Sequence, residues 1–192
     1  MRTEDLVAAL ENAPVSPLRE DYLAFVSARG GAAHRRSLGD EHVTASCFVF
    51  SPDLRQVLLC FHRKGRFWVQ FGGHIEERDA TVAEAARREA REESGIGGLE
   101  LLSERIADLD RHELHGGFTC AVHWDIGFVA VVSTDTAVSS SDESEDVRWF
   151  SVDDLPGDVP SEFPARMRNL RELVPSLSVP SGDASSPSAA DH

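Results

Sequence analysis

The sequence predicts an α/β fold, in which a mixed domain of strands and helices follows a helical leader. Strand-forming residues such as Val, Ile, Phe and Thr are concentrated in separate runs, at 43–50, 57–61, 67–71, 100–107 and 121–132. A helix-forming segment over 81–94 lies between the third and fourth of these runs. Strands and helices that alternate along one chain are typical of the α/β class.

Length and charge limit the classes of protein that this chain can be. At roughly 150 residues per domain, its 192 residues correspond to one domain and an appendage. It carries 19 Lys and Arg against 33 Asp and Glu, a net charge of −14. Such acidity repels the phosphate backbone of DNA, so we expect no DNA partner. A small phosphorylated substrate remains compatible, because a divalent cation can supply positive charge.

Neither a membrane segment nor a disulfide framework is expected. No apolar run approaches the roughly 18 residues that a membrane span needs, and no apolar core of a signal peptide follows Met1–Asp5. Cys47, Cys60 and Cys120 form neither an even set nor a CxxC pair. We therefore expect a reduced, cytoplasmic protein.

The first 40 residues are expected to form a helical leader. Residues 1–12 present apolar side chains on one helical face, and Pro14 and Pro17 interrupt the pattern before it resumes over 18–28. The simplest interpretation is a structural cover for the main domain; a substrate lid or a homodimer contact is the alternative.

The main domain is expected over 41–174. Its third strand is predicted over 67–71, with Gly72-Gly73 as an interruption. Thr81-Val82-Ala83-Glu84 is a capping-box pattern that starts the next helix, and Gly95 is well placed to stop it.

Towards its carboxyl end the chain becomes acidic and then rich in Ser and Pro. We expect a loop over 139–146, a short strand over 147–150 and a closing helix over 161–173. The composition of 175–192 predicts a disordered tail.

Three carboxylates on the predicted helix indicate a metal site. Glu89, Glu92 and Glu93 are spaced i, i+3 and i+4, which places them on one face. Like charges so placed repel one another, and a hard cation such as Mg²⁺ would satisfy them, joined by a backbone carbonyl of Gly72-Gly73. A solvated acidic face, partly neutralised by Arg88, is the alternative.

The segment GGHIEERDATVAEAARREAREESGI resembles the Nudix hydrolase box. From Arg88 to Ile96 it matches at every fixed position. The first half departs twice, because Asp79 stands where the family has Glu and one extra residue precedes Arg88. Glu76 or Glu77 could therefore replace Asp79 in holding Arg88. The resemblance covers roughly 43–172.

This resemblance implies an α/β/α sandwich around a mixed sheet and the hydrolysis of a diphosphate linked to another group, X. It implies Mg²⁺ or Mn²⁺ held by Glu89, Glu92, Glu93 and the carbonyl of Gly72, with Arg88 orienting the glutamates. Glu92 or Glu93 is the expected general base on the helix, and Glu143 is the candidate from the loop.

Several residues outside the box are candidates for substrate binding. Arg63 and Lys64 follow the second strand and could contact phosphates. Trp68 and Phe67 could line the pocket; the alternative is that they join the core, as aromatic residues beside a Gly-Gly break more often do. His112, His115, Cys120 and His123 form a cluster that could hold zinc, but their spacing fits no standard finger. We expect this segment to lie beside the active site, with His112 and His123 contacting substrate.

Two other functions remain open from the sequence. A Nudix-fold isoprenoid-diphosphate isomerase would require a catalytic cysteine, for which Cys120 is the candidate. A non-catalytic nucleotide sensor is the other, although sensors often lose box glutamates and this chain keeps all three. The small-molecule diphosphate or nucleotide substrate itself cannot be read from the box.

Overall fold

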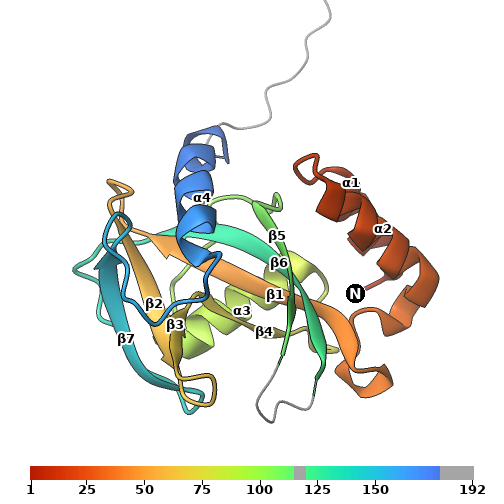
Figure 1. Cartoon of the computed structure of the whole chain (residues 1–192), viewed down its shortest axis with the longest axis horizontal. Helices are drawn as coiled ribbons and strands as arrows, with labels where there is room; N and C mark the ends of the chain where they lie inside the picture. The colour runs from red at the N-terminus through yellow and green to blue at the C-terminus, as the bar shows by residue number, and fades with distance from the viewer. Residues whose placement is uncertain (115–119, 178–192) are drawn as a thin grey trace, which may run out of the picture.

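A computed structural model describes residues 1–114 and 120–177. It contains a seven-stranded mixed sheet with helices on both faces, which confirms the predicted α/β class (Figure 1). The helices are α1 (Thr3–Glu11), α2 (Pro17–Arg29), α3 (Val82–Ser94) and α4 (Phe163–Leu177), with short 3₁₀ turns at Gly30–Ala32 and Arg36–Leu38. The strands are β1 (Glu41–Phe50), β2 (Gln56–His62), β3 (Phe67–Val69), β4 (Phe71–His74), β5 (Asp108–Glu113), β6 (Val122–Val131) and β7 (Ser144–Ser151).

Strand β1 lies at the centre of the sheet and organises it. Along one edge it pairs in parallel with β6 over its whole length. Its other edge is shared, since β4 pairs with residues 44–47 and β2 pairs with Val49 and Phe50. Strands β4 and β2 therefore pair with successive segments of the same edge of β1.

Residues of β1 alternate between the two faces of the sheet. Cys47 and Val49 pack with Ala90 of α3, whereas Phe48 and Phe50 pack with Phe163 and other apolar residues of α4. Thr44 and Ser46 share the α4 face but line a cavity instead of joining the core.

The leader helices α1 and α2 pack against the sheet through an aromatic contact. The Trp124 ring of β6 stacks on Phe25, with centroids 4.5 Å apart, and meets the edge of Tyr22. The buried Tyr22 hydroxyl lies 2.8 and 2.7 Å from the main-chain carbonyls of Asp110 and Asp125, to either of which it can donate its one proton. The leader therefore covers part of the sheet, as the simplest interpretation expected.

Helix α3 begins and ends where its capping residues predict. Thr81 is the N-cap, and its side chain accepts a hydrogen bond from the Glu84 N–H at 3.1 Å. The Glu84 carboxylate accepts from Ala80 N–H, one residue before the cap. Gly95 closes the helix in the left-handed conformation, with φ of +73°.

The structure corrects several element boundaries. Gly72 and Gly73 continue strand β4 instead of interrupting it. The run 100–107 forms only an isolated bridge at Leu101, and the strand lies at 108–113. The strand has mostly polar side chains, so a search for apolar runs does not find it. Two of them, Asp108 and Asp110, form ion pairs with Arg166 of α4. His112 thus lies on strand β5.

At the carboxyl end, two elements are longer than expected. Strand β7 begins at Ser144, inside the predicted acidic loop, and α4 continues to Leu177, with Pro175 in its last turn. The rest of the expected tail, 178–192, lies outside the described residues. Across the described chain, no helix combines the length and apolarity that a membrane crossing requires.

Candidate functional site

Helix α3 brings its acidic face against strand β4. The Gly72 N–H donates a hydrogen bond to Glu93 Oε2 at 2.8 Å, and the Glu93 side chain is buried. A Cβ atom on Gly73 would lie 2.6 Å from Glu89 Oε1, so only glycine leaves room for this carboxylate. Glu92, on the outer side of the helix, is half exposed.

Arg88 holds this acidic face in place. Its guanidinium donates to both Asp79 oxygens, at 3.0 and 2.8 Å, and to the His74 carbonyl at 2.9 Å. It also donates to Glu89 Oε1 at 2.9 Å and to Glu92 Oε2 at 3.2 Å. One partly buried cation therefore fixes the positions of two of the three glutamates.

Asp79 is the partner of Arg88, despite its departure from the family's glutamate. It forms the two-point contact, whereas Glu76 approaches Arg88 only to 3.9 Å. Asp79 also accepts a hydrogen bond from the Glu76 N–H at 2.8 Å. Although burial opposes ionisation, hydrogen bonds from Arg88 and Glu76 keep the pKa of Asp79 below its ordinary value.

The carboxylates of α3 are crowded and poorly solvated. Burial raises the pKa of Glu93 to about 8, and the negative charges of Glu89, Glu143 and Glu92 add to the effect. Burial likewise raises the pKa of Glu89 to about 6, against the lowering influence of Arg88. Crowded, poorly solvated carboxylates such as Glu89 and Glu93 favour the binding of a cation that neutralises them. Because all their donor atoms are oxygens, a hard divalent ion suits them.

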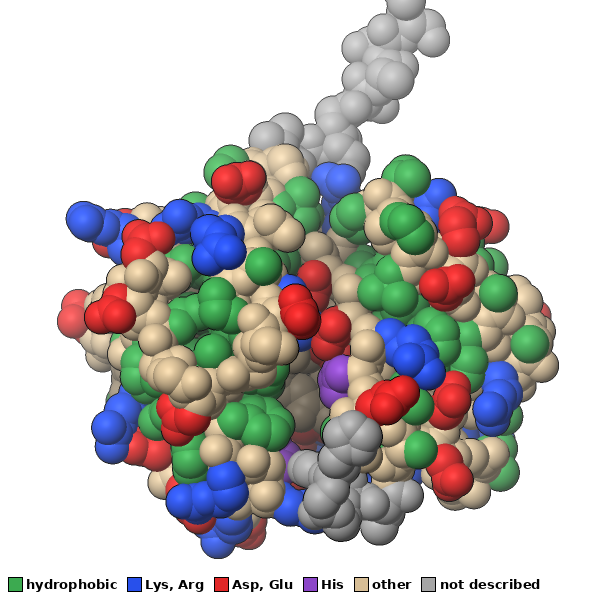
Figure 2. Space-filling model, in the orientation of Figure 1, with side chains coloured by type: hydrophobic (Ala, Val, Ile, Leu, Met, Phe, Trp, Pro, Cys, Tyr) green, Lys and Arg blue, Asp and Glu red, His purple; other side chains and the backbone are tan. Residues whose placement is uncertain are grey.

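A cavity of about 440 Å³ opens beside Gly72 and Gly73, lined by residues of β1, β3, β4 and β6 among others. Figure 2 shows a hollow in the molecule, with histidine side chains visible in it and acidic side chains above. Arg63, Lys64 and Glu143 line the cavity, as do His112 and His123. All five were predicted from the sequence to act in catalysis or substrate binding.

The two loops that carry these charged residues are tied together. The Arg63 N–H donates to the Glu143 carbonyl at 3.0 Å, and Arg66 pairs with Glu145 at 2.6 Å. Glu143 therefore has a defined position at the cavity. Its negative charge contributes to the raised pKa values of Glu89 and Glu93.

Asp125 forms a buried polar floor to the cavity. Its carboxylate accepts hydrogen bonds from Thr44 and Ser46 of β1, at 3.0 and 2.6 Å, and from Gln70 at 3.2 Å. We had not selected Asp125 as a site residue. Its signal in the sequence was the only acidic residue of a strand that is mostly apolar.

Of the two aromatic residues proposed for the pocket, Trp68 belongs to the core and does not line this cavity. Its ring packs with Phe61 and Phe150 in the apolar cluster beneath α4. The cavity is instead lined by its neighbours Phe67 and Val69, because successive strand residues point to opposite faces.

The histidine cluster differs from the one that the sequence suggested. His112 pairs with Asp110 at 2.8 Å, and His115 lies outside the described residues. Cys120 and His123 instead meet His42 and His74, which come from distant parts of the chain. Burial lowers the pKa of His74 to about 4 and that of His123 to about 3, so both imidazoles are neutral at pH 7.

Comparison with known protein families identifies the class of protein to which this fold and its acidic helix belong. A family model described as NUDIX domain matches residues 40–174. The chain belongs to the Nudix family and is a hydrolase. Members of this family generally use divalent metal ions. A comparison with curated protein sequences finds no match.

Solved structures share the fold at low sequence identity. A NUDIX-family hydrolase from Clostridium perfringens is 22% identical, with a TM-score of 0.56 over 71% of this chain and 97% of its own. The dihydroneopterin triphosphate pyrophosphohydrolase of E. coli is 18% identical, with a TM-score of 0.55 over 70% and 95%. An Ap4A hydrolase of C. elegans is 16% identical, with a TM-score of 0.53 over 70% and 98%.

Alanine substitutions at the two neighbouring glycines should have different consequences. In Gly73→Ala the new methyl group displaces the mobile end of Glu89, so hydrolase activity should fall by about 10-fold or more with little loss of stability. In Gly72→Ala the methyl group meets Ser46 Cβ at 2.7 Å and the Ala45 carbonyl at 2.8 Å, so unfolding should become easier by about 1–3 kcal/mol. Turnover and urea unfolding measured on both variants check this pair; equal effects on both would contradict it.

Proposed function

We propose that this protein hydrolyses a diphosphate bond in a nucleoside diphosphate linked to X, with Mg²⁺ or Mn²⁺ as cofactor. The observation that carries the proposal is the pair of the buried Glu93 and the partly buried Glu89, held against Gly72-Gly73, with Glu89 oriented by Arg88. The neighbours that cleave nucleotide-like diphosphates support the substrate class, although they share only the fold with this chain.

The proposed ligands of the metal are Glu89, Glu92, Glu93 and the Gly72 carbonyl. The Gly72 N–H turns away from β1 towards Glu93, and in an extended strand the C=O of a residue leaves on the same side as its N–H. The carbonyl therefore faces the glutamates. Bound there, a divalent ion would neutralise phosphate charge and lower the pKa of a water molecule.

The protein's own residues orient the reactants and accept the proton. Arg88 restrains Glu89 and Glu92 through direct hydrogen bonds and so acts as a positioning residue. Arg63 and Lys64 lie at the cavity, where their charges can bind the phosphates of the substrate. His112 and His123, direct partners on the paired strands β5 and β6, complete the proposed substrate contacts.

Among the candidate bases Glu92, Glu93 and Glu143, the cavity favours Glu143. It lines the cavity, whereas Glu92 is committed to Arg78 and Arg88 and Glu93 to the Gly72 N–H. We therefore assign proton acceptance to Glu143 and metal binding to the helix glutamates.

A panel of nucleotides and nucleotide sugars, assayed with Mg²⁺ and with Mn²⁺ for released phosphate and pyrophosphate, tests the proposal. Metal-dependent turnover is expected on at least one substrate, and it should disappear in the E92Q/E93Q double variant. Turnover that survives in this variant would contradict the proposed site. A nucleotide that raises the Tm but yields no product would favour the sensor.

A further inference from the structure

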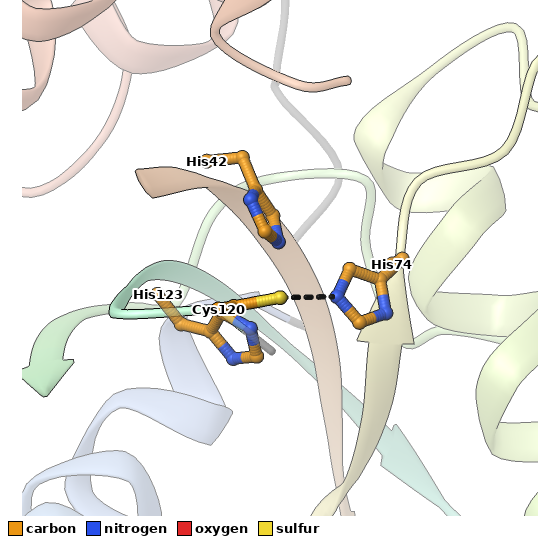
Figure 3. A group of neighbouring side chains, drawn as sticks. All are labelled: His42, His74, Cys120 and His123. Carbon is orange, nitrogen blue, oxygen red and sulfur yellow. Dashed lines mark hydrogen bonds between the residues drawn. The ribbon is translucent and has the colours of Figure 1, made fainter. Parts of the chain in front are cut away.

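Four potential metal ligands converge on one wall of the cavity. Figure 3 shows the side chains of His42, His74, Cys120 and His123 directed towards a common space. One ligand atom from each residue lies within 4.8 Å of all the others. The Cys120 sulfur lies 3.7 Å from His74 Nε2. Two ligands of a tetrahedral zinc ion are about 3.5 Å apart, as Zn–N and Zn–S bond lengths require.

Strand register creates this grouping. His42 of β1 is the direct partner of His123 on β6, and His74 of β4 is the partner of Thr44, two residues along β1. All three imidazoles therefore project from the same face of the sheet. Their ring centroids form a nearly regular triangle, with sides of 5.0, 5.2 and 5.3 Å.

Two of the ring nitrogens are buried and have no hydrogen-bond partner among the residues that the structure describes. These are Nε2 of His42 and Nε2 of His123. His42 is only 1% exposed, and its other nitrogen, Nδ1, lies 3.4 Å from the Gly39 carbonyl. A carbonyl only accepts, so Nδ1 carries the proton and Nε2 presents a lone pair. Metal-binding histidines commonly have this arrangement, with one nitrogen held by a carbonyl and the other left for the ion.

We propose that His42, His74, Cys120 and His123 bind one zinc-class divalent ion at a site separate from the glutamates of α3. Three imidazoles and a thiolate are borderline or soft ligands, which suit zinc and disfavour magnesium. Four protein ligands make a closed site with a structural role. Arg36 also lines the cavity and its charge opposes a cation, and the thiolate of Cys120 supplies the compensating negative charge.

The consequence concerns the shape of the substrate cavity. Cys120 lies two residues before the start of β6 and His74 ends β4, so a shared ion would fix these two segments to each other and to β1. Gly72 and Gly73 lie on the same cavity and immediately precede His74. His123 would then shape the wall of the cavity and would no longer contact substrate directly.

Zinc titration of the full chain, made metal-free and without a histidine tag, tests this proposal. We expect one Zn²⁺ per chain in competition with a chromophoric chelator. The H42Q and C120S variants should each bind zinc more than about 100-fold more weakly, since even the loss of an outer partner commonly costs 10–100-fold. The E89Q/E93Q variant should bind zinc within about threefold of the wild type, because its lost ligands belong to the other site.

A cavity histidine outside the group provides the matched control. H62Q should keep the zinc affinity, since His62 lies elsewhere on the cavity wall. Zinc binding unaffected by H42Q and C120S, or abolished by E89Q/E93Q, would overturn the proposal.

A spectroscopic measurement covers the case in which the variants fail to fold. The wild-type chain loaded with Co²⁺ should show a thiolate-to-metal charge-transfer band in the near ultraviolet. Bound Co²⁺ without that band would show that Cys120 is not a ligand and would also overturn the proposal.

Discussion

The E93Q variant should hydrolyse its substrate about 100-fold or more slowly than the wild type while keeping its fold. Glutamine has nearly the shape of glutamate, and its side-chain oxygen can still accept the hydrogen bond from the Gly72 N–H. What the variant loses is a negative charge at the proposed metal site. Steady-state kinetics over a range of Mg²⁺ concentrations, alongside thermal unfolding, measure the two effects separately.

The thermal stability of the E93Q variant should stay equal or rise, whereas its activity falls. Burial and neighbouring charges disfavour the ionised form of Glu93, so its neutral replacement should give a metal-free protein with an equal or higher Tm. E104Q removes one negative charge from an exposed position outside the site and serves as the matched control. A large loss of stability in E93Q, with turnover per folded molecule unchanged, would assign Glu93 a structural role instead.

The D79A variant should be destabilised by about 3 kcal/mol, the lower end of the range for breaking a buried ion pair. Asp79 is 4% exposed and makes both contacts of the two-point pair with Arg88. Arg88 retains Glu89 and Glu92 as partners, which keeps the loss from being larger. Urea unfolding at pH 7 measures the change, and an unchanged midpoint would contradict the role of Asp79.

A double-mutant cycle and a pH series make this prediction specific. The D79A/R88A variant should lose less stability than the sum of the single variants, because the two residues share one interaction. The pKa of Asp79 is lowered in the folded chain, so its contribution is present above the ordinary carboxyl pKa. That contribution should disappear as the pH falls through the folded-state pKa. D79A should accordingly show a flatter loss of stability in acid.

The sequence by itself determined the features that depend on local geometry. The spacing of Glu89, Glu92 and Glu93 defines one face of any helix, and Thr81 and Gly95 define where that helix starts and stops. The shared helix face and the two caps involve residues within a few positions of each other. They therefore depend on local geometry and not on how distant segments pack. The family resemblance rests on the same short segment, and the family match over 40–174 confirms it.

Only the tertiary structure decided which distant residues meet. The sequence left Asp79, Glu76 and Glu77 as possible partners of Arg88, and the approach of the β4–α3 connection to the helix selected Asp79. His42 and His74 join Cys120 and His123 because β1 pairs with β4 and β6 in one particular register. A shift by one residue would turn His42 to the other face of the sheet. Register depends on the packing of whole strands and cannot be read from spacing along the chain.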